Sequence, residues 1–294
     1  MDIQGYKILL DLSKSQNLTR TAETFGYSQP GISHVIKNME KEFGFLLINR
    51  EKYGVTLTRE ALELMPGVRE LVYSNEKLEE TVYAIKGLEY GKVTLATYSS
   101  IASHLLPKLL TEFKNNHPNI TVDIREGGAK DIFEWLDSNS VEFAFVSKPY
   151  DRKIDFHSFG KDPLVAVLPK GYVLDGEEEF RIENFEGKPF ILSADGNDFD
   201  VHHALESSGV RPVYNYSVLD DQTILSMVEN RLGLSILSEL ICLKSTYKVD
   251  ILPLEPEFYR DLGIAIKKNN KLSPAAEKFV RFANEKMPEI FLNA

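Results

Sequence analysis

Residues 28–41 carry side chains that can bond to DNA bases and phosphates. A glutamine can pair with adenine through two hydrogen bonds, a proline can contact a thymine methyl group, and a lysine can reach phosphate. Three of the positions have the spacing i, i+3 and i+7, which places them on one face of a helix. The segment therefore predicts a DNA-recognition helix, with an ordinary solvated face as the alternative. The residues expected to bind DNA here are Ser28, Gln29, Pro30, Ser33, His34 and Lys37, with Lys41 on the same face.

Polar residues on either side of this segment can hold the DNA backbone. Thr19 and Arg20 come before it, and Arg50 and Lys52 come after it. We expect these four side chains to contact phosphates, which fixes the position of a protein on DNA without reading its sequence. For Arg50 the alternative is a surface ion pair with Glu40 or Glu51.

A second polar cluster follows predicted strands in the later part of the chain. Tyr98-Ser99-Ser100-Ile101 lies between a predicted strand at Val93–Ala96 and a predicted helix. Hydroxyls and backbone N–H groups at a helix start can bind an anion, although Ser99 or Ser100 could simply cap the helix. Gly128, Ala129 and Ser147 follow two other predicted strands, and a lone Gly-Gly is only a weak phosphate signal. The residues expected to form a ligand-binding site in this part of the chain are Tyr98, Ser99, Ser100, Ile101, Gly128, Ala129, Ser147, Asp198, His202 and Thr223.

The stretch from Asp195 to His203 combines acidic residues with two histidines, a composition that could bind a divalent metal. No glycine follows at the offset that a calcium loop needs, and adjacent histidines point to different faces of a helix or strand. We therefore predict no metal and expect a polar rim of an effector cleft instead. Ser99, Ser100 and His104 lack a G-x-S-x-G turn and an orienting acid, so the sequence predicts no enzyme.

Short helices with tight joints must position the first polar segment. Thr19 is a plausible cap of a helix that stops at Gly26, and Ser28 with Pro30 starts the next helix. Ile32, Ile36 and Met39 belong to the buried stripe of that helix, which ends at Gly44. Residues 46–48 and 55–57 look like a small β-hairpin. The pattern predicts a winged helix-turn-helix over residues 1–58.

Residues 59–90 predict a long linker helix with an apolar seam. Seam positions alternate spacings of four and three, which is typical of a coiled coil, and a single asparagine among them favours a defined dimer. One amphipathic helix packed on its own domain is the alternative, and Pro66-Gly67 could kink the helix. The predicted dimer seam consists of Leu64, Val68, Leu71, Asn75, Leu78, Val82 and Ile85.

Residues 91–294 alternate predicted strands and helices, which indicates an α/β fold with a mostly parallel sheet. About 200 residues of this kind suit two lobes with a cleft between them. We place lobe I at about 91–161 and 267–294, and lobe II at about 162–266.

Composition and charge limit the class of protein. The 294 residues carry a net charge of −10, but residues 1–62 hold eight Lys or Arg against seven Asp or Glu. The DNA-reading part is therefore at +1 and the rest of the chain at −11, which suggests different partners for the two parts. A single cysteine, Cys242, excludes an intrachain disulfide and is expected to be a buried apolar residue. No signal peptide or membrane span is evident, so we expect a cytoplasmic protein with no membrane partner.

Over its full length the chain resembles the LysR-type transcriptional regulators. The N-terminal match consists of Ala22, Ser28-Gln29-Pro30-Gly31-Ile32-Ser33, Ile36, Met39-Glu40, Gly44, Leu47, Arg50 and Leu57-Thr58. The later match consists of Leu105-Leu106-Pro107, residues 162–169 and residues 228–237. Thr21, Ile48 and Ala61 depart from the family's usual residues at packing positions.

The resemblance implies a winged helix-turn-helix, a linker helix and an effector domain like the type 2 periplasmic binding proteins. It further implies a regulator that binds double-stranded promoter DNA as a dimer or tetramer, controlled by a small-molecule effector between the lobes. The effector is unidentified, an anion is one expectation, and no other cofactor is predicted. The competing possibilities are a solute-binding protein and an enzyme built on the two-lobed fold.

Overall fold

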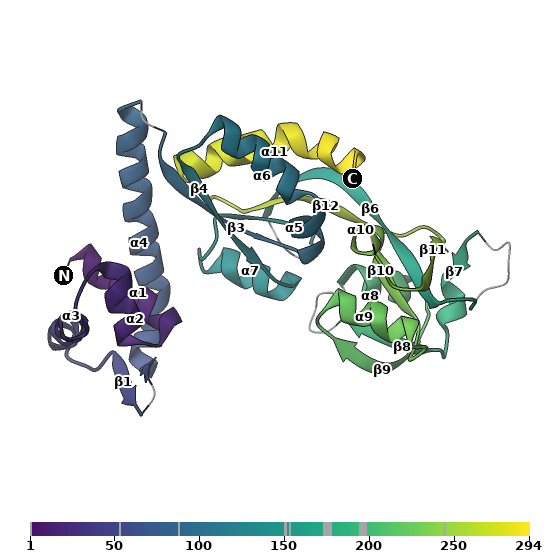
Figure 1. Cartoon of the computed structure of the whole chain (residues 1–294), viewed down its shortest axis with the longest axis horizontal. Helices are drawn as coiled ribbons and strands as arrows, with labels where there is room; N and C mark the ends of the chain where they lie inside the picture. Colours follow the sequence, from purple (N-terminus) through teal and green to yellow (C-terminus); the bar gives the residue numbers. More distant parts are fainter. Residues whose placement is uncertain are drawn as a thin grey trace. The chain divides into compact units, whose positions relative to one another are not determined.

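The computed structural model describes residues 2–52, 54–87, 89–149, 152, 154–172, 178–193, 199–243 and 245–294 (Figure 1). Residues 1–90 form one compact unit, and residues 91–137 with 141–294 form another. Within the described residues, no helix combines the length and the apolar composition needed to cross a membrane.

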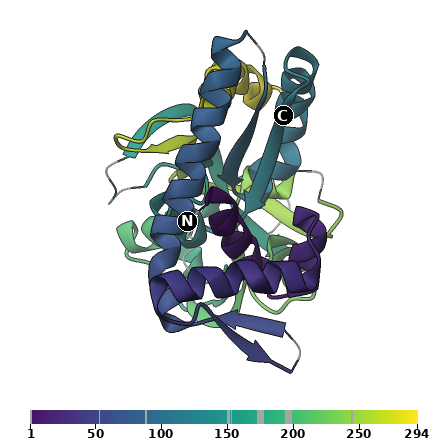
Figure 2. The same ribbon diagram turned by 90° about the vertical axis from the view of Figure 1, so that its left-hand side faces the viewer.

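The first unit is a small helical core with a hairpin. It contains α1 (Ile3–Ser15), α2 (Leu18–Phe25), α3 (Gln29–Phe43), β1 (Ile48–Glu51) and β2 (Gly54–Leu57). Figure 2 shows α3 from the side, with the β1–β2 hairpin below it in this view. Ile8, Ile32 and Ile36 are fully buried where the three helices meet. The buried Thr21 hydroxyl donates to Asp11 Oδ2 at 2.7 Å, so the threonine at this packing position is satisfied.

The caps of α2 and α3 fix the short turn between them. The α2 cap is Asn17, not the expected Thr19, because the Asn17 Oδ1 accepts from the backbone N–H groups of Thr19 at 2.9 Å and Arg20 at 3.1 Å. Gly26 ends α2 with a φ of 68°. Ser28 caps α3 as expected, since its Oγ accepts from Gly31 N at 3.2 Å.

Helix α4 (Arg59–Ile85) is continuous and passes through Pro66. The predicted seam along it divides into two parts. Val68 is 4% exposed and packs with Leu64 against the core of the first unit. Further along, Leu71, Leu78, Val82 and Ile85 are exposed, and the Asn75 amide donates to Glu79 at 2.8 Å. The alternative of a helix packed on its own domain thus describes the beginning of α4. In its later turns Val72 and Glu80 are buried, while the apolar residues of the predicted seam are exposed.

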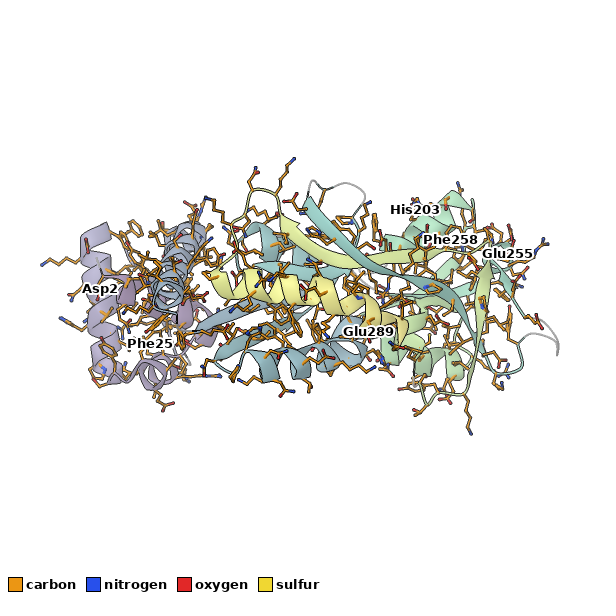
Figure 3. All side chains as sticks on the ribbon, turned by 90° about the horizontal axis from the view of Figure 1, so that it is seen from above. Asp2, Phe25, His203, Glu255, Phe258 and Glu289 are labelled. Atoms are coloured by element: carbon orange, nitrogen blue, oxygen red, sulfur yellow. The ribbon has the colours of Figure 1, made fainter. Side chains whose placement is uncertain are left out.

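In the second unit, lobe I is a sheet covered by helices. Its strands β3 (Gly91–Thr97), β4 (Ile120–Glu126) and β5 (Phe143–Ser147) pair in parallel. Its helices are α5 (Ser99–His104), α6 (Leu106–Asn116), α7 (Ala129–Asp137) and α11 (Pro274–Leu292). Helix α11 runs along this lobe (Figure 3) and packs through Phe279, whose ring centroid lies 4.6 Å from that of Phe113.

Lobe II holds the other strands and helices of the second unit, apart from two long strands that cross between the lobes. Its strands are β7 (Phe180–Arg181), β8 (Pro189–Ser193), β9 (Val213–Val218), β10 (Ser235–Ser238) and β11 (Val249–Glu255). Its helices are η1 (Ile182–Phe185), α8 (Phe199–Ser207), α9 (Asp221–Glu229) and α10 (Glu239–Cys242). Strands β8 and β9 pair in parallel, and Phe185 and Phe190 are fully buried in the core of this lobe.

Two long strands cross from one lobe to the other. β6 (Ile154–Pro169) and β12 (Tyr259–Lys267) pair antiparallel, with Asp162 opposite Arg260. β12 also pairs with β5 of lobe I, whereas β6 continues into antiparallel pairs with β10 and β11 of lobe II. The sheet is therefore mixed, and the expectation of a mostly parallel sheet is wrong, because each crossing strand runs against its neighbours.

Candidate nucleic-acid interface and effector pocket

The start of α3 presents polar side chains to solvent. Ile32, Ile36 and Met39 bury one side of the helix, while Pro30, His34 and Lys37 are exposed on the rest. Gln29 is half-buried, and its Nε2 lies 3.3 Å from Ser33 Oγ, to which it donates. The core thus fixes the helix and leaves its first turns accessible to a ligand.

Cations surround this face without protein partners. Arg20, Lys37 and Arg50 are exposed, and none forms an ion pair within the part of the chain that the structure describes. The two acids expected to compete for Arg50 are engaged elsewhere. Glu40 Oε1 accepts from Leu47 N at 2.8 Å, and Glu51 accepts from the Thr56 hydroxyl at 2.8 Å. Thr19 and Lys52, the other expected phosphate contacts, are exposed as well.

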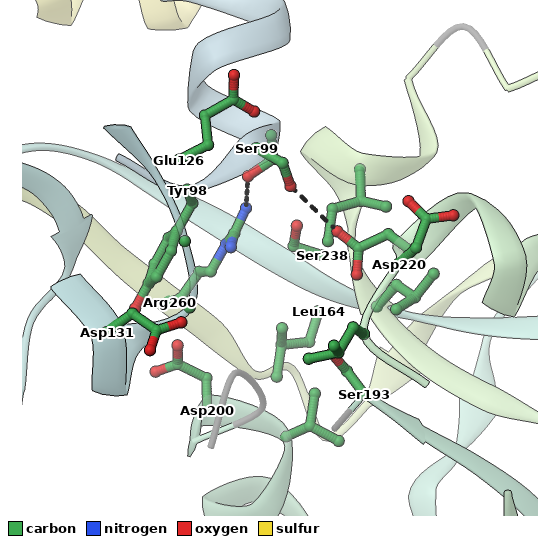
Figure 4. A pocket seen from close by; sticks show the side chains of 18 residues that line it. Tyr98, Ser99, Glu126, Asp131, Leu164, Ser193, Asp200, Asp220, Ser238 and Arg260 are labelled. Carbon is green, nitrogen blue, oxygen red and sulfur yellow. Dashed lines mark hydrogen bonds between the residues drawn. The ribbon is translucent and has the colours of Figure 1, made fainter. Parts of the chain in front are cut away.

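A pocket of about 340 Å³ opens between the two lobes of the second unit (Figure 4). From lobe I, Tyr98, Ser99 and Ser100 line it where β3 ends, together with the segment from Glu126 to Gly128 and Asp131. From lobe II and the crossing strands come Leu164, Ser193, Asp200, Val201, Leu219, Asp220, Asp221, Leu237, Ser238, Ile241 and Arg260. Strand ends and helix starts thus converge here, as expected for an α/β ligand site.

A buried ion pair forms the floor of the pocket at the crossing of the lobes. Arg260 Nε donates to Asp162 Oδ2 at 2.7 Å, and Arg260 Nη2 donates to Ser100 Oγ at 2.8 Å. The other Asp162 oxygen accepts from Leu240 N at 3.0 Å. Asp162 is 1% exposed and Arg260 is 8% exposed, and the carboxylates of Asp162 and Asp200 help to raise the pKa of Arg260. The guanidinium is charged and its charge is balanced inside the protein.

Two carboxylates of lobe II reach lobe I across the pocket. Ser99 Oγ donates to Asp221 Oδ2 at 3.4 Å, and the Ser147 hydroxyl lies close enough to Asp200 to favour its ionised form. Burial is the main cause that raises the pKa of both Asp200 and Asp221, and Arg260 opposes that rise through its positive charge. Ser147 also lies 3.2 Å from the hydroxyl of Tyr98, whose pKa is raised mainly by burial.

The expected effector residues divide into those that line the pocket and those that do not. Tyr98, Ser99, Ser100 and Gly128 line it. Ser147 lies within hydrogen-bond distance of the Tyr98 hydroxyl, while Ile101 is buried in the core of lobe I and Ala129 starts α7. His202 lies against Tyr214, with ring centroids 6.2 Å apart, and Thr223 bonds to Asp220 at the start of α9. Asp198 lies outside the described residues, as do Asp195 and Asn197.

Tyr98 occupies the cap position of α5, so Ser99 and Ser100 are the first residues of that helix and not its cap. The Gly-Gly pair has a packing reason, because a Cβ on Gly127 would lie 2.7 Å from the Trp135 ring. Among the described residues, no group of three His, Cys, Asp or Glu side chains could hold a metal.

Several pocket residues lie outside the polar clusters predicted from the sequence. They include Asp220, Asp221, Ser238 and Arg260. Asp221 follows β9, and Ser238 ends β10. Attention to the carboxyl ends of these two strands would have found them, whereas nothing local distinguishes Arg260.

Cys242 is buried against lobe II, and burial raises the pKa of its thiol to about 12. The thiolate is the reactive form, so we expect iodoacetamide to alkylate the folded protein at least about a hundredfold more slowly than the urea-unfolded chain at neutral pH. Intact mass spectrometry over time measures both rates. Equal rates in the two states would contradict the buried, protonated thiol.

Two family models match the chain, one in its N-terminal part and one in its C-terminal part. Residues 3–62 match the family model "Bacterial regulatory helix-turn-helix protein, lysR family", and residues 86–288 match "LysR substrate binding domain". The chain belongs to the LysR family. It is a LysR-type transcriptional regulator, and its relatives are regulators and not enzymes.

Two relatives match along nearly the whole chain, and a third matches about two thirds of it. The HTH-type regulator YvbU of Bacillus subtilis, itself uncharacterized, is 26% identical and the match covers 97% of this chain and 98% of that protein. Full-length CbnR, solved in complex with its target DNA, has a TM-score of 0.70 at 16% identity and covers 97% of this chain and 99% of its own. The effector-binding domain of QuiR, solved with shikimate, has a TM-score of 0.63 at 23% identity, with 68% and 98% covered.

Proposed function

We propose that this LysR-type regulator reads promoter DNA through α3 and the β1–β2 hairpin, and that a small molecule between its lobes controls the arrangement of its DNA-binding units. The observation that carries the first part is the exposed start of α3, with Gln29 and Pro30 beside unpaired cations. Gln29 and Ser33 read base edges, and Lys37 and Arg50 bind phosphates. Thr19, Arg20, Ser28, His34 and Lys52 complete the contact surface.

We infer that two copies pair through the exposed apolar side of α4. Leu71, Leu78, Val82 and Ile85 form an exposed apolar stripe along α4. A second copy of α4 with the same spacing would bury it and place two recognition helices on a two-fold-related site. Family membership and the solved CbnR–DNA complex support this arrangement.

The pocket between the lobes is the proposed effector site. Its lining comes from both lobes, and only β6 and β12 cross between them among the described strands. A ligand that contacts both walls favours one closure of the lobes over others, because it binds that closure more tightly. The LysR substrate-binding match and the effector-binding domain of QuiR, solved with shikimate, support a small-molecule ligand in this domain.

Two substitutions in α3 test the assignment of roles. Gln29→Ala should lower affinity for the correct promoter site by about 1–3 kcal/mol and leave binding to random DNA unchanged. Lys37→Ala should weaken binding to both DNAs alike and reduce the slope of log affinity against log salt by about 1. Fluorescence anisotropy at several salt concentrations measures both effects, with a promoter fragment selected from random DNA by the wild-type protein.

Lys188→Ala in the second unit is the matched control and should change neither affinity nor slope, because Lys188 is exposed and distant in sequence from the DNA-binding unit. Absence of any sequence preference in the wild-type protein would contradict the proposed function. Equal losses of specificity from Gln29→Ala and Lys37→Ala would contradict the roles given to the two residues.

A further inference from the structure

We propose that the pocket between the lobes binds an organic cation, whose ammonium or guanidinium group is held by Asp200 and Asp221 with Ser238 as a further acceptor. The inference deepens the function proposed above and rests on the pocket being the effector site. It replaces the expectation of an anionic effector, for reasons of charge, hydrogen bonding and shape.

The charge of the lining is strongly negative. Five carboxylates line the pocket, from Glu126, Asp131, Asp200, Asp220 and Asp221, and Arg260 is the only lysine, arginine or histidine among the described lining residues. Figure 4 shows Asp131, Asp200 and Asp220 around the cavity, with Arg260 at its base. Arg260 is already paired with Asp162 at 2.7 Å, so its single charge balances the five carboxylates of the lining only in part. A small anion would face several carboxylates, whereas a cation would neutralise them.

An unsatisfied hydroxyl provides a second, independent indication of a ligand. Ser238 ends β10 and lines the pocket, and it is 3% exposed. Its Oγ is buried with no hydrogen-bond partner in the described part of the protein. Ser238 stands at the N-cap position of α10, but its side chain makes no capping hydrogen bond. Buried hydroxyls are rarely left unpaired, because each loses its bonds to water. An N–H donor on a bound ligand would satisfy this oxygen.

The surroundings of Asp200 and Asp221 favour the binding of a cation between the two carboxylates. Asp200 faces Ser147, Arg260, His203 and Asp162, and burial outweighs their combined effect and raises its pKa. Asp221 faces Arg260, Asp220 and Ser99, with the same result and the same main cause. Arg260 thus leaves both carboxylates incompletely compensated. A cation bound between them would stabilise both ionised forms.

The remaining walls favour an organic ion over a metal ion. Leu164, Val201, Leu219, Leu237 and Ile241 supply apolar surface within a cavity of about 340 Å³, which is the size of a small ligand site. Among the described residues, no three His, Cys, Asp or Glu side chains are placed so that they could bind one metal ion. An alkyl chain or ring that carries an ammonium or guanidinium group meets both the apolar walls and the carboxylates.

A set of short-chain compounds of different charge tests the ligand class on the full-length protein. The probes are putrescine and agmatine as cations, butanediol as the neutral counterpart and succinate as the anion. Binding is measured by calorimetry and by the fluorescence of Trp135, which lies in α7 one turn beyond Asp131. Putrescine and agmatine should bind and raise the Tm of the protein, and butanediol and succinate should do neither.

Substitutions locate the cation within the pocket. Asp200→Asn and Asp221→Asn should each weaken cation binding by roughly 10- to 100-fold, since a charge-assisted hydrogen bond is replaced by a neutral one. Ser238→Ala should weaken it by a smaller factor. Glu257→Gln is the matched control, because Glu257 is exposed in lobe II outside the pocket, and it should bind as the wild type does. Circular dichroism verifies that each variant is folded.

The pH dependence has a defined sign. A cation prefers the ionised carboxylates, so its affinity should fall as the pH is lowered through the raised pKa values of Asp200 and Asp221, and binding should release protons. Asp221→Asn should reduce this proton release, which a merely structural role would leave unchanged.

The outcomes separate this inference from the proposed function. If putrescine and agmatine bind no better than butanediol, or if Asp200→Asn and Asp221→Asn leave their affinity unchanged, the cationic class is wrong. Succinate binding that strengthens in Asp221→Asn would also overturn it, while keeping the pocket as the effector site. Promoter preference, measured on the same protein without any probe, tests the proposed function by itself.

Discussion

Replacement of Arg260 by methionine should lower the free energy of unfolding of the second unit by about 3–5 kcal/mol. Arg260 lies opposite Asp162 where β6 and β12 cross between the lobes, and its Nε and Nη2 groups donate to Asp162 and Ser100. Methionine fills much of the same volume but leaves the Asp162 carboxylate, 1% exposed, with the Leu240 N–H as its one remaining partner among the residues that the structure describes. An uncompensated buried charge is among the most costly defects that one substitution can produce.

Urea denaturation measures this loss, and Trp135, the single tryptophan, reports on lobe I. The control is the double variant Arg260→Met with Asp162→Asn, in which the asparagine Oδ1 can still accept from Leu240 N. Because the buried charge is then absent, more than half of the lost stability should return. A loss below about 1 kcal/mol in Arg260→Met would show that the pair is not the buried, mutually dependent unit described here.

Local patterns were sufficient to predict the DNA-binding unit. The stripe that includes Ile32, Ile36 and Met39 has helical spacing, Ser28 and Gly44 mark the ends of α3, and the structure agrees on all of these. The error at the α2 cap has a simple cause. Asn17 and Thr19 are both good cap residues, and the choice between them depends on which side chain reaches two free N–H groups at once.

The pocket was harder to predict because its residues are brought together by pairing of distant strands. Ser99 and Asp221 are 122 positions apart in sequence, and Ser100 and Arg260 are 160 positions apart. The sequence predicted that strand ends form a site and named the part at the end of β3. It did not reveal that Arg260 is paired with Asp162, an observation on which the proposal of a cationic ligand depends. Spacing along the chain carries no record of such a pair, since opposite charges 98 residues apart have many possible partners.

The sequence was also ambiguous about α4, because a seam of apolar residues does not say which of its members face the same chain. Leu64 and Val68 pack into the first unit, while the later members of the seam have no such cover. Helical spacing is identical in the two parts. Which seam residues are covered depends on which part of α4 packs against the helices of the first unit, and the folded structure is needed to show this.

Leu78→Arg should reduce affinity for a two-fold-related promoter site by about 10²- to 10⁴-fold, because the advantage of linking two DNA-binding units is lost. Leu78 is 64% exposed in the single chain, so the substitution leaves the fold of the monomer intact. In the proposed pair of α4 helices it would place two positive charges in an apolar seam. The added charge is positive and would favour DNA by itself, so a loss of affinity has to come from loss of pairing.

Sedimentation velocity should show a lower oligomeric state for Leu78→Arg, and anisotropy should show that affinity for a single half-site is unchanged. Leu292→Arg is the matched control, because Leu292 is 83% exposed at the end of α11 and lies outside the seam. A module with a net charge of +1 has few phosphate contacts to offer alone, so pairing carries most of the specific affinity. If Leu78→Arg remains a dimer with undiminished affinity, the exposed stripe of α4 is not the dimer seam.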